Sequence, residues 1–178
     1  MADSKKLVPF ILSWETDKYT NNKYDKGGPT KYGITLATWR RVGYDKNGDG
    51  VLNEEDVKLL TEEDFHRVFK QNYWNACKAD QIQDQSVANM LVDFAYNSGV
   101  SRAVKYLQKT LGVTADGIIG KNTLSAINGA DGKKLFERFK KARKNYLIRI
   151  AVGEQKNNLE GWLRRVSYIT YGHLKLNE

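Results

Sequence analysis

A glutamate at position 15 is followed by an aspartate and a threonine, Asp25 and Thr30, that could take part in the same reaction. Glu15 comes directly after an apolar helical stripe that includes Trp14. A carboxyl on that face would be partly desolvated, which favours the protonated form that a general acid needs. Asp25 and Thr30 lie in the segment "DKGGPTKYG" and could place or activate a water. An acid and a placed water are the minimum for glycosidic hydrolysis with inversion.

The same residues also have a purely structural interpretation. Glu15 can be a helix-end residue exposed by fraying, and Asp25 can be a turn former beside Gly27 and Gly28. The spacing alone leaves both interpretations open.

The elements that must position these residues are predicted to be mainly α-helical. Apolar residues recur at helical spacing over residues 7–14, 65–69, 87–95, 135–150 and 159–166. The string "TEED" from Thr61 predicts a helix N-cap with acids in the first turn. Between residues 17 and 34 the pattern breaks into Asn, Asp, Gly and Pro, which predicts turns and a small β-hairpin.

The length of 178 residues fits one domain, or one domain with a closely packed subdomain. A soft boundary near "ACKADQIQDQS" divides the chain into residues 1–80 and 81–178, which we expect to pack as one globular unit and to remain monomeric. Cys77 is the single cysteine, so an internal disulfide is excluded, and no motif marks it as a nucleophile. Neither His66 nor His173 has a partner at the spacing of a zinc site.

The formal net charge of +8 favours an anionic partner, although the solvated faces of basic helices explain it equally well. The sequence has no zinc-finger, RRM or Walker pattern, so nucleic acid is not the expected partner. No apolar run approaches the roughly 20 residues of a membrane span, and no transmembrane segment is expected.

The segment "DKNGDGVLNEED" has the spacing of an EF-hand calcium loop. Oxygen ligands fall at loop positions 1, 3 and 5, a glycine at 6, a backbone carbonyl at 7 and a carboxylate at 12. An aspartate at the last position is one methylene shorter than the usual glutamate, so weaker Ca²⁺ binding, or Mg²⁺, is expected. The alternative is an acidic turn. The predicted ligands of this structural ion are Asp45, Asn47, Asp49, Val51 and Asp56, and no cofactor is expected for catalysis.

The segment "SWETDKYTNNKYDKGGPTKYGIT" resembles the N-terminal segment of glycoside hydrolase family 108, the N-acetylmuramidases that include secretion activator proteins. In the family pattern a Glu-Gly-Gly-Tyr is followed by an Asn and by Asp-x-Gly-Gly-x-Thr-x-Tyr-Gly-Ile. Here both glycines after the glutamate are absent and one residue is inserted, giving "ETDKY". The matching residues are Glu15, Tyr19, Asn21, Asp25, Gly27, Gly28, Thr30, Tyr32, Gly33 and Ile34.

This resemblance implies a lysozyme-like fold that cleaves the β-1,4 bond between N-acetylmuramic acid and N-acetylglucosamine. Glu15 would be the acid, and Asp25 or Thr30 would position the water. Tyr19, Tyr32 and Gly33 would contact the substrate.

The second half of the chain is similar to the peptidoglycan-binding helical repeat. The matching string reads LQ-x-x-LG-V and then DG-x-x-G-x-x-T, and begins at Leu107 and Gln108. Its Asp116, Gly117 and Gly120 either face a ligand or only turn the chain. Asn97, in "FAYNSG", is a further candidate for the substrate groove.

Two functions of different classes remain at this point. The first is a muramidase, of bacterial or endolysin type. The second is a non-catalytic peptidoglycan-binding or secretion-accessory protein on a lysozyme-like fold. In either case the chain is expected to be made in the cytoplasm without a recognisable signal peptide, and to act at the cell wall or in the periplasm if exported.

Overall fold

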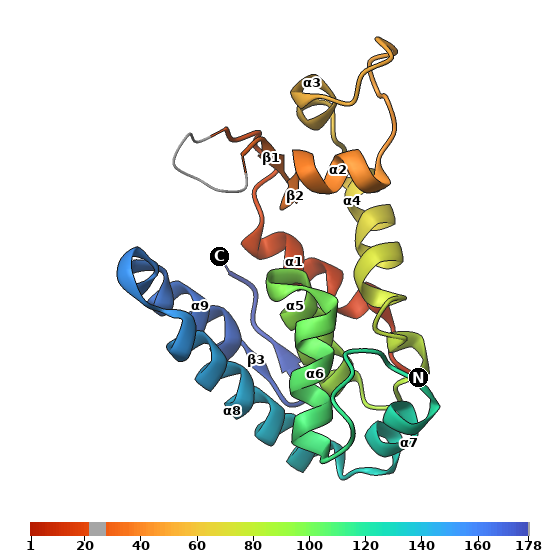
Figure 1. Ribbon diagram of the computed structural model, residues 1–178, viewed down its shortest axis with the longest axis vertical. Helices are drawn as coiled ribbons and strands as arrows, with labels where there is room; N and C mark the ends of the chain where they lie inside the picture. The colour runs from red at the N-terminus through yellow and green to blue at the C-terminus, as the bar shows by residue number, and fades with distance from the viewer. Residues whose placement is uncertain (22–27, 178) are drawn as a thin grey trace.

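The computed structural model describes residues 1–21 and 28–177, and it is mainly helical (Figure 1). Within these described residues, two small antiparallel sheets accompany the helices, and this architecture confirms the predicted mainly-α, lysozyme-like fold class. The α-helices are α1 (Val8–Trp14), α2 (Leu36–Val42), α3 (Glu54–Lys58), α4 (Glu62–Phe69), α5 (Gln85–Ser98), α6 (Val100–Leu111), α7 (Lys121–Gly129), α8 (Gly132–Ile150) and α9 (Leu159–Ser167).

Shorter turns complete the chain. Three are 3₁₀ turns, at Ser4–Lys6, Ala79–Gln81 and Gly153–Asn158, and a π-helical turn spans Lys70–Trp74. The strands are β1 (Thr30–Lys31), β2 (Ile34–Thr35), β3 (Ile169–Thr170) and β4 (His173–Leu174).

The first sheet is a hairpin whose turn is two residues long. Thr30 pairs with Thr35 across the hairpin. The turn residues Tyr32 and Gly33 have φ angles of 52° and 71°. Positive φ at both central positions is the signature of the type I′ turn, whose twist matches that of two antiparallel strands. An isolated bridge between Thr20 and Thr30 extends the pairing on the other side of β1.

Helix α1 ends one residue earlier than the apolar stripe suggested. Its last residue is Trp14, and Glu15 is the C-cap with an extended backbone, at φ −103° and ψ 143°. Because Glu15 has left the helix, the 3.6-residue period does not direct its side chain. Its environment is therefore set by the elements that pack against the end of α1.

A single hydrophobic core runs through both halves of the molecule. It includes Phe10 of α1 and Phe65 of α4 as well as Phe139 of α8 and Val166 of α9. Helix α5 lies in the middle of this arrangement, against α6 and α8 (Figure 1), and every residue from 86 to 95 is buried. The hydrophobic core is therefore continuous across the predicted boundary near residue 80, and the position of that boundary stays a prediction.

The peptidoglycan-repeat string forms a hydrogen-bonded turn between α6 and α7. The buried amide of Gln108 donates to Asp116 Oδ1, to the Ile118 carbonyl and to Thr123 Oγ1, at 2.7, 3.0 and 3.1 Å. The Gly117 N–H donates back to Gln108 Oε1 at 2.8 Å. These residues turn the chain by satisfying one buried amide.

Across the described ranges, no helix has both the length and the apolar character to cross a bilayer.

Candidate active site

The carboxylate of Glu15 belongs to a buried chain of charged groups. Its Oε1 accepts from Arg165 Nη1 at 2.8 Å. Arg165 donates from Nε and Nη2 to Asp93 Oδ1, at 3.0 and 2.8 Å. The second oxygen of Asp93 lies 2.7 Å from Arg143 Nη2. The side chains of Asp93, Arg143 and Arg165 are 0, 3 and 10% exposed, so water screens these interactions little.

The two arginines keep Asp93 ionised. Burial acts to raise the pKa of Asp93, but the charges of Arg165 and Arg143 outweigh it and the pKa lies below the usual range. Burial likewise acts to lower the pKa of Arg165, and the carboxylates of Asp93 and Glu15 raise it instead. A fixed guanidinium therefore stands beside Glu15.

The other oxygen of Glu15, Oε2, lies beside the hairpin turn. A Cβ at Gly33 would stand 2.8 Å from Oε2 and would clash with the hydroxyl of Tyr96. Tyr96 itself donates to the Tyr32 carbonyl at 2.9 Å, which ties the turn to the end of α5. The absence of a side chain at Gly33 is thus what lets the hairpin turn approach the carboxylate.

Two phenols lie near this carboxylate. The rings of Tyr73 and Tyr96 have centroids 4.9 Å apart. Burial, and then the charge of Glu15, raises the pKa of Tyr96 well above its usual range. The pKa of Tyr73 is raised chiefly by burial, against the opposing charge of Arg41. Both hydroxyls therefore stay protonated and neutral at physiological pH.

Trp14 covers the other side of the ion pair. Its ring packs edge-on against Tyr168, with centroids 5.4 Å apart, and the Arg165 guanidinium lies 5.7 Å from its centroid.

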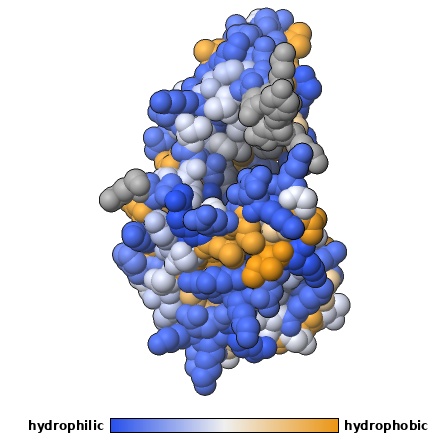
Figure 2. All heavy atoms as spheres, turned by 90° about the vertical axis from the view of Figure 1, so that its left-hand side faces the viewer, coloured by the Kyte–Doolittle hydropathy of each residue, from blue (hydrophilic) through white to orange (hydrophobic). Residues whose placement is uncertain are grey.

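Figure 2 shows the face of the molecule on which the hairpin and α9 lie. This face is hollowed between the hairpin end and the helical part, and apolar atoms gather below the hollow.

The remaining predicted catalytic residues are only partly described. Asp25, Gly27 and the residues between Asn21 and Gly28 lie outside the described residues. Thr30 is half-buried at the start of β1, and its hydroxyl donates to the Gly28 carbonyl at 2.8 Å.

The predicted substrate residues lie in different environments. The Tyr19 hydroxyl donates to Glu54 Oε2 at 3.0 Å, which links the hairpin region to α3 and away from Glu15. Tyr32 and Gly33 form the turn beside Glu15. Asn97 is exposed at the end of α5, where its amide donates to the Asp93 carbonyl at 2.7 Å.

The missing family glycines leave no strained backbone behind. Among the residues that the structure describes, Tyr32 and Lys78 are the non-glycine residues with positive φ, so Thr16, Asp17 and Lys18 keep to the ordinary φ range. The Lys18 N–H donates to Thr16 Oγ1 at 3.0 Å, which makes a short local turn instead. The Thr16 carbonyl accepts from the Tyr32 N–H at 2.9 Å and so holds the hairpin turn in place.

The predicted metal ligands of the loop from Asp45 to Asp56 have the spacing of a calcium loop, but their side-chain oxygens mainly accept hydrogen bonds from backbone amides. The two carboxylate oxygens of Asp45 accept from the N–H groups of Gly48 and Gly50, both at 2.7 Å. Asp49 accepts from Val51 N–H at 2.8 Å, and Asn47 accepts from Asp49 N–H at 3.0 Å.

Asp56, the last predicted ligand, caps a helix. It is fully buried and accepts from the N–H groups of Lys46 and Asn53, which completes the capping box of α3. Within the described ranges, no three His, Cys, Asp or Glu side chains converge as a metal site would require. The calcium site stays a prediction.

Sequence reasoning missed four residues of the site. Asp93 and Tyr96 sit on α5 among buried apolar neighbours, and Arg143 and Arg165 sit on helices whose basic residues suggested only a charged surface. The sequence does place two charged residues, Asp93 and Arg143, on apolar helix faces. Because buried charges are rare unless they are paired, these two residues could have indicated a buried ion pair.

Comparison with known proteins agrees with this architecture. The model of the family "Glycosyl hydrolase 108" matches residues 8–99, and that of the "Predicted Peptidoglycan domain" matches residues 102–167. Glu15 and Asp93 thus lie in the first segment, and Arg143 and Arg165 in the second. The comparison with curated proteins returns no match.

Among solved structures, the chain is similar to SagA of Brucella abortus. The two are 33% identical with a TM-score of 0.78, over 93% of this chain and 90% of that one. The match spans both segments, and the first family model alone covers more than half of the chain. The second segment matches the predicted peptidoglycan domain, and the chain belongs to the glycosyl hydrolase 108 family.

Proposed function

We propose that this protein is a peptidoglycan hydrolase that cleaves the β-1,4 bond between N-acetylmuramic acid and N-acetylglucosamine. The observation that carries the proposal is the setting of Glu15. One of its oxygens is held by Arg165 at 2.8 Å, and the other, Oε2, takes no part in that ion pair and lies beside the glycine of the hairpin turn. The family models for a glycosyl hydrolase and a peptidoglycan domain support the choice of polymer.

The proposed reaction assigns the proton to the oxygen of Glu15 that is free of the ion pair. Oε2 would donate it to the glycosidic oxygen, and the bond from that oxygen to the anomeric carbon would break. A water would attack the same carbon, and its proton would pass to a carboxylate such as that of Asp25. Thr30 could orient this water through its hydroxyl lone pairs, but a hydroxyl is too weak a base to take the proton.

The test compares Glu15→Gln with the wild type by the release of new reducing ends from purified peptidoglycan. Glutamine keeps the shape of the side chain and its acceptor oxygen for Arg165, but it has no acidic proton to give. The exposed Glu63, on α4, gives a matched control as Glu63→Gln. We expect cleavage by the wild type and the control and none by Glu15→Gln, with wall binding unchanged in all three.

A second candidate function is a non-catalytic wall-binding or secretion-accessory protein. The specific observation in its favour is the absence of both family glycines after Glu15, in "ETDKY". If neither wild type nor variant cuts while both bind the wall, this second function is the correct one. In either case we propose that the protein acts at the cell wall after export.

A further inference from the structure

A groove lies along helix α6, beside the C-terminal end of α8. The two helices run in opposite directions (Figure 1), because Arg102 near the start of α6 reaches Tyr146, whereas Thr110 near its end accepts from Arg138. The volume of the groove is about 560 Å³. Its lining residues have no part in the cleavage proposed above, so the groove has no assigned role.

The charged side chains of the groove are all cations. Arg102, Lys105 and Lys109 come from α6 and Arg149 comes from α8, and all four are exposed. Among the described residues, no aspartate or glutamate lines the groove, and none of the four cations takes part in an ion pair. Four positive charges around one hollow repel one another, so the entry of an anion is favoured.

One acid acts on this face from outside the groove. The charge of Asp116 reaches Lys105. Its Oδ1 accepts from the Gln108 amide at 2.7 Å and from the Ile118 N–H at 2.9 Å. Asp116 is therefore held by the turn after α6, which leaves the ammonium groups of Lys105 and Lys109 for a ligand.

The cations of α6 form a line along the helix. Arg102, Lys105 and Lys109 are spaced i, i+3 and i+7, which places them on one face. At a rise of about 1.5 Å per residue, this line is roughly 10 Å long. A single small anion cannot contact all three side chains, whereas a linear polymer with repeated negative charges can. The expected ligand is therefore a polyanion.

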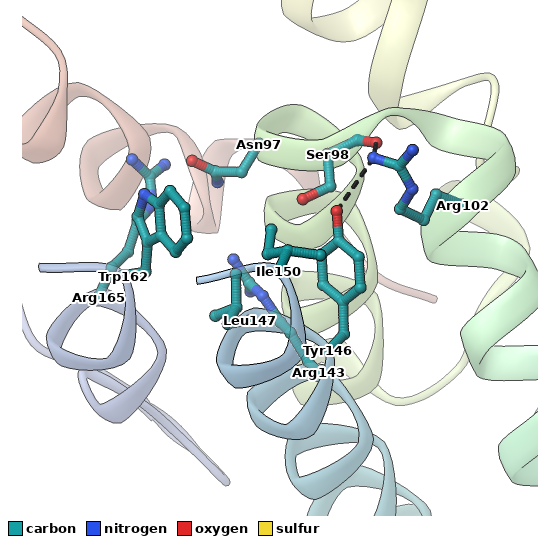
Figure 3. A pocket seen from close by; sticks show the side chains of 9 residues that line it. All are labelled: Asn97, Ser98, Arg102, Arg143, Tyr146, Leu147, Ile150, Trp162 and Arg165. Atoms are coloured by element: carbon teal, nitrogen blue, oxygen red, sulfur yellow. Dashed lines mark hydrogen bonds between the residues drawn. The ribbon is translucent and has the colours of Figure 1, made fainter. Parts of the chain in front are cut away.

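The free donors suit phosphate better than carboxylate. Arg102 donates from Nη1 to the Ser98 carbonyl at 3.2 Å and to the Tyr146 hydroxyl at 3.0 Å, and Figure 3 shows both bonds. Arg149 donates from Nη2 to the Tyr106 hydroxyl. The end-on fork of each guanidinium, which would bind a carboxylate in a bidentate way, is thus already in use. The lysine ammonium groups remain, and they bind phosphate oxygens as point charges.

The groove offers no open aromatic ring to a base. Tyr106 is the aromatic residue among the described residues of its lining, and its ring packs against Phe94 and Tyr146, with centroids 5.6 and 5.2 Å away. Lys109 Nζ and the Arg149 guanidinium lie over the same ring, 5.7 and 6.0 Å from its centroid. Single-stranded nucleic acids gain much of their affinity by stacking on open rings. A phosphate polymer without bases is therefore favoured.

We propose that this groove binds a linear polymer of sugars or polyols joined by phosphodiesters. Successive phosphates would lie against Lys105 and Lys109, with Arg102 and Arg149 beside them. A lipid bilayer fits less well, because the groove is concave and Val100 is the one aliphatic side chain among its described lining residues. The groove would thus hold the protein on a second, phosphorylated polymer, apart from the bond next to Glu15. The proposed function suggests where the protein meets this polymer, but the binding itself does not depend on cleavage.

The test is a calorimetric titration of the full chain with a short oligomer of glycerol phosphate. An oligogalacturonate of equal length presents its negative charges as carboxylates. An oligothymidylate of equal length and vesicles of phosphatidylglycerol, compared at equal phosphate concentration, present phosphates with bases or on a bilayer. We expect the glycerol phosphate oligomer to bind several-fold more tightly than each of these three. Its binding should weaken as the salt concentration rises.

Two double variants of equal charge locate the binding. Lys105→Gln with Lys109→Gln removes two exposed cations from the groove. Lys133→Gln with Lys156→Gln removes two exposed cations that do not line it. Because all four side chains are exposed, the fold is not at risk, and thermal unfolding checks this. We expect the groove variant to bind the glycerol phosphate oligomer about tenfold more weakly than the wild type, and the control variant to bind it as the wild type does.

The outcomes separate this proposal from the proposed function. Preferred binding of the glycerol phosphate oligomer that the groove variant alone weakens supports the site, whether or not the protein cuts peptidoglycan. No binding of this oligomer, or an equal loss in both double variants, would overturn it. Equal or tighter binding of the oligogalacturonate, the oligothymidylate or the vesicles would overturn it as well. None of these results bears on the role of Glu15 in cleavage.

Discussion

Arg165 Nη1 lies 2.8 Å from Glu15 Oε1, although 150 residues separate the two in the sequence. Arg165 is itself held by two hydrogen bonds to Asp93, so its guanidinium has little freedom to move. A planar group fixed in this way constrains both the position and the rotation of the carboxylate that it binds. Arg165 thus acts as a positioning residue for the proposed acid.

Replacing Arg165 should therefore reduce turnover rather than binding. For Arg165→Gln we expect kcat to fall about 100-fold, because small errors in the position of a catalytic group are costly, while KM changes little. Arg165→Lys restores the charge without the planar fork and should recover part of the rate. The neighbouring exposed Arg164 gives the control, Arg164→Gln. A rise in KM with kcat unchanged would show that Arg165 serves the substrate and not Glu15.

The hairpin turn gives a second prediction. Gly33→Ala should abolish cleavage, because a Cβ there would stand 2.8 Å from Glu15 Oε2 and its backbone has a φ of 71°. In Gly129→Ala, by contrast, the added Cβ meets nothing within 4 Å, and activity should be unchanged. Reducing-end release and thermal unfolding measure the two effects. Full activity in Gly33→Ala would mean that the turn can move away from the carboxylate without cost.

Asp93 is expected to carry a large part of the stability. Asp93→Asn leaves the buried guanidinium groups of Arg143 and Arg165 without their shared carboxylate. Removing one partner of a buried ion pair typically costs about 3–5 kcal/mol. The exposed Glu137, on α8, provides the control as Glu137→Gln. Urea unfolding gives the difference, and a cost equal to that of the control would show that the chain of charges contributes no stability.

The same carboxylate predicts how stability depends on pH. The pKa of Asp93 is lower in the folded state than in the unfolded chain, where the pKa of an aspartate is about 4. The unfolded state therefore binds the proton first, and the contribution of Asp93 is present above this pH and lost as pH falls through the folded pKa. The stability difference between wild type and Asp93→Asn should shrink as pH is lowered below about 4. A constant difference across this range would contradict the assignment.

We propose that the loop from Asp45 to Asp56 binds Ca²⁺. Addition of Ca²⁺ should raise the melting temperature and EDTA should lower it. Asp49→Asn is the variant of choice, because Asp49 is exposed in the loop, whereas Asp56→Asn would disturb the capping box of α3 with or without a metal. The Ca²⁺ response should be smaller in Asp49→Asn. No shift of the melting temperature across millimolar Ca²⁺ would leave the loop as an acidic turn.

Much of the fold follows from local patterns in the sequence. The helical periods and the "TEED" cap predicted their helices, because amphipathic spacing and N-cap chemistry act within a few residues. The Tyr32-Gly33 turn lies inside the predicted hairpin region for the same reason. The helical period did not predict the environment of Glu15, because Glu15 is a C-cap with an extended backbone and does not lie on a helical face.

The charged part of the site could not be predicted in this way. The contact of Arg165 with Asp93 joins residues 72 positions apart, and no local spacing records such a pairing. Single buried charges on otherwise apolar helices indicate that partners exist, but not which residues they are. The loop spacing likewise matched a calcium site without showing that its carboxylates accept from backbone amides.

The cross-segment pairing of Glu15 with Arg165 also limits how such chains can be recombined. The two family models divide the chain near residue 100, which invites the exchange of one segment for that of another protein. A chimera made at that junction would exchange Arg143 and Arg165 while keeping Glu15 and Asp93. The two segments are therefore separate in sequence but cannot be exchanged independently. An incoming second segment must supply arginines that reach the same two carboxylates.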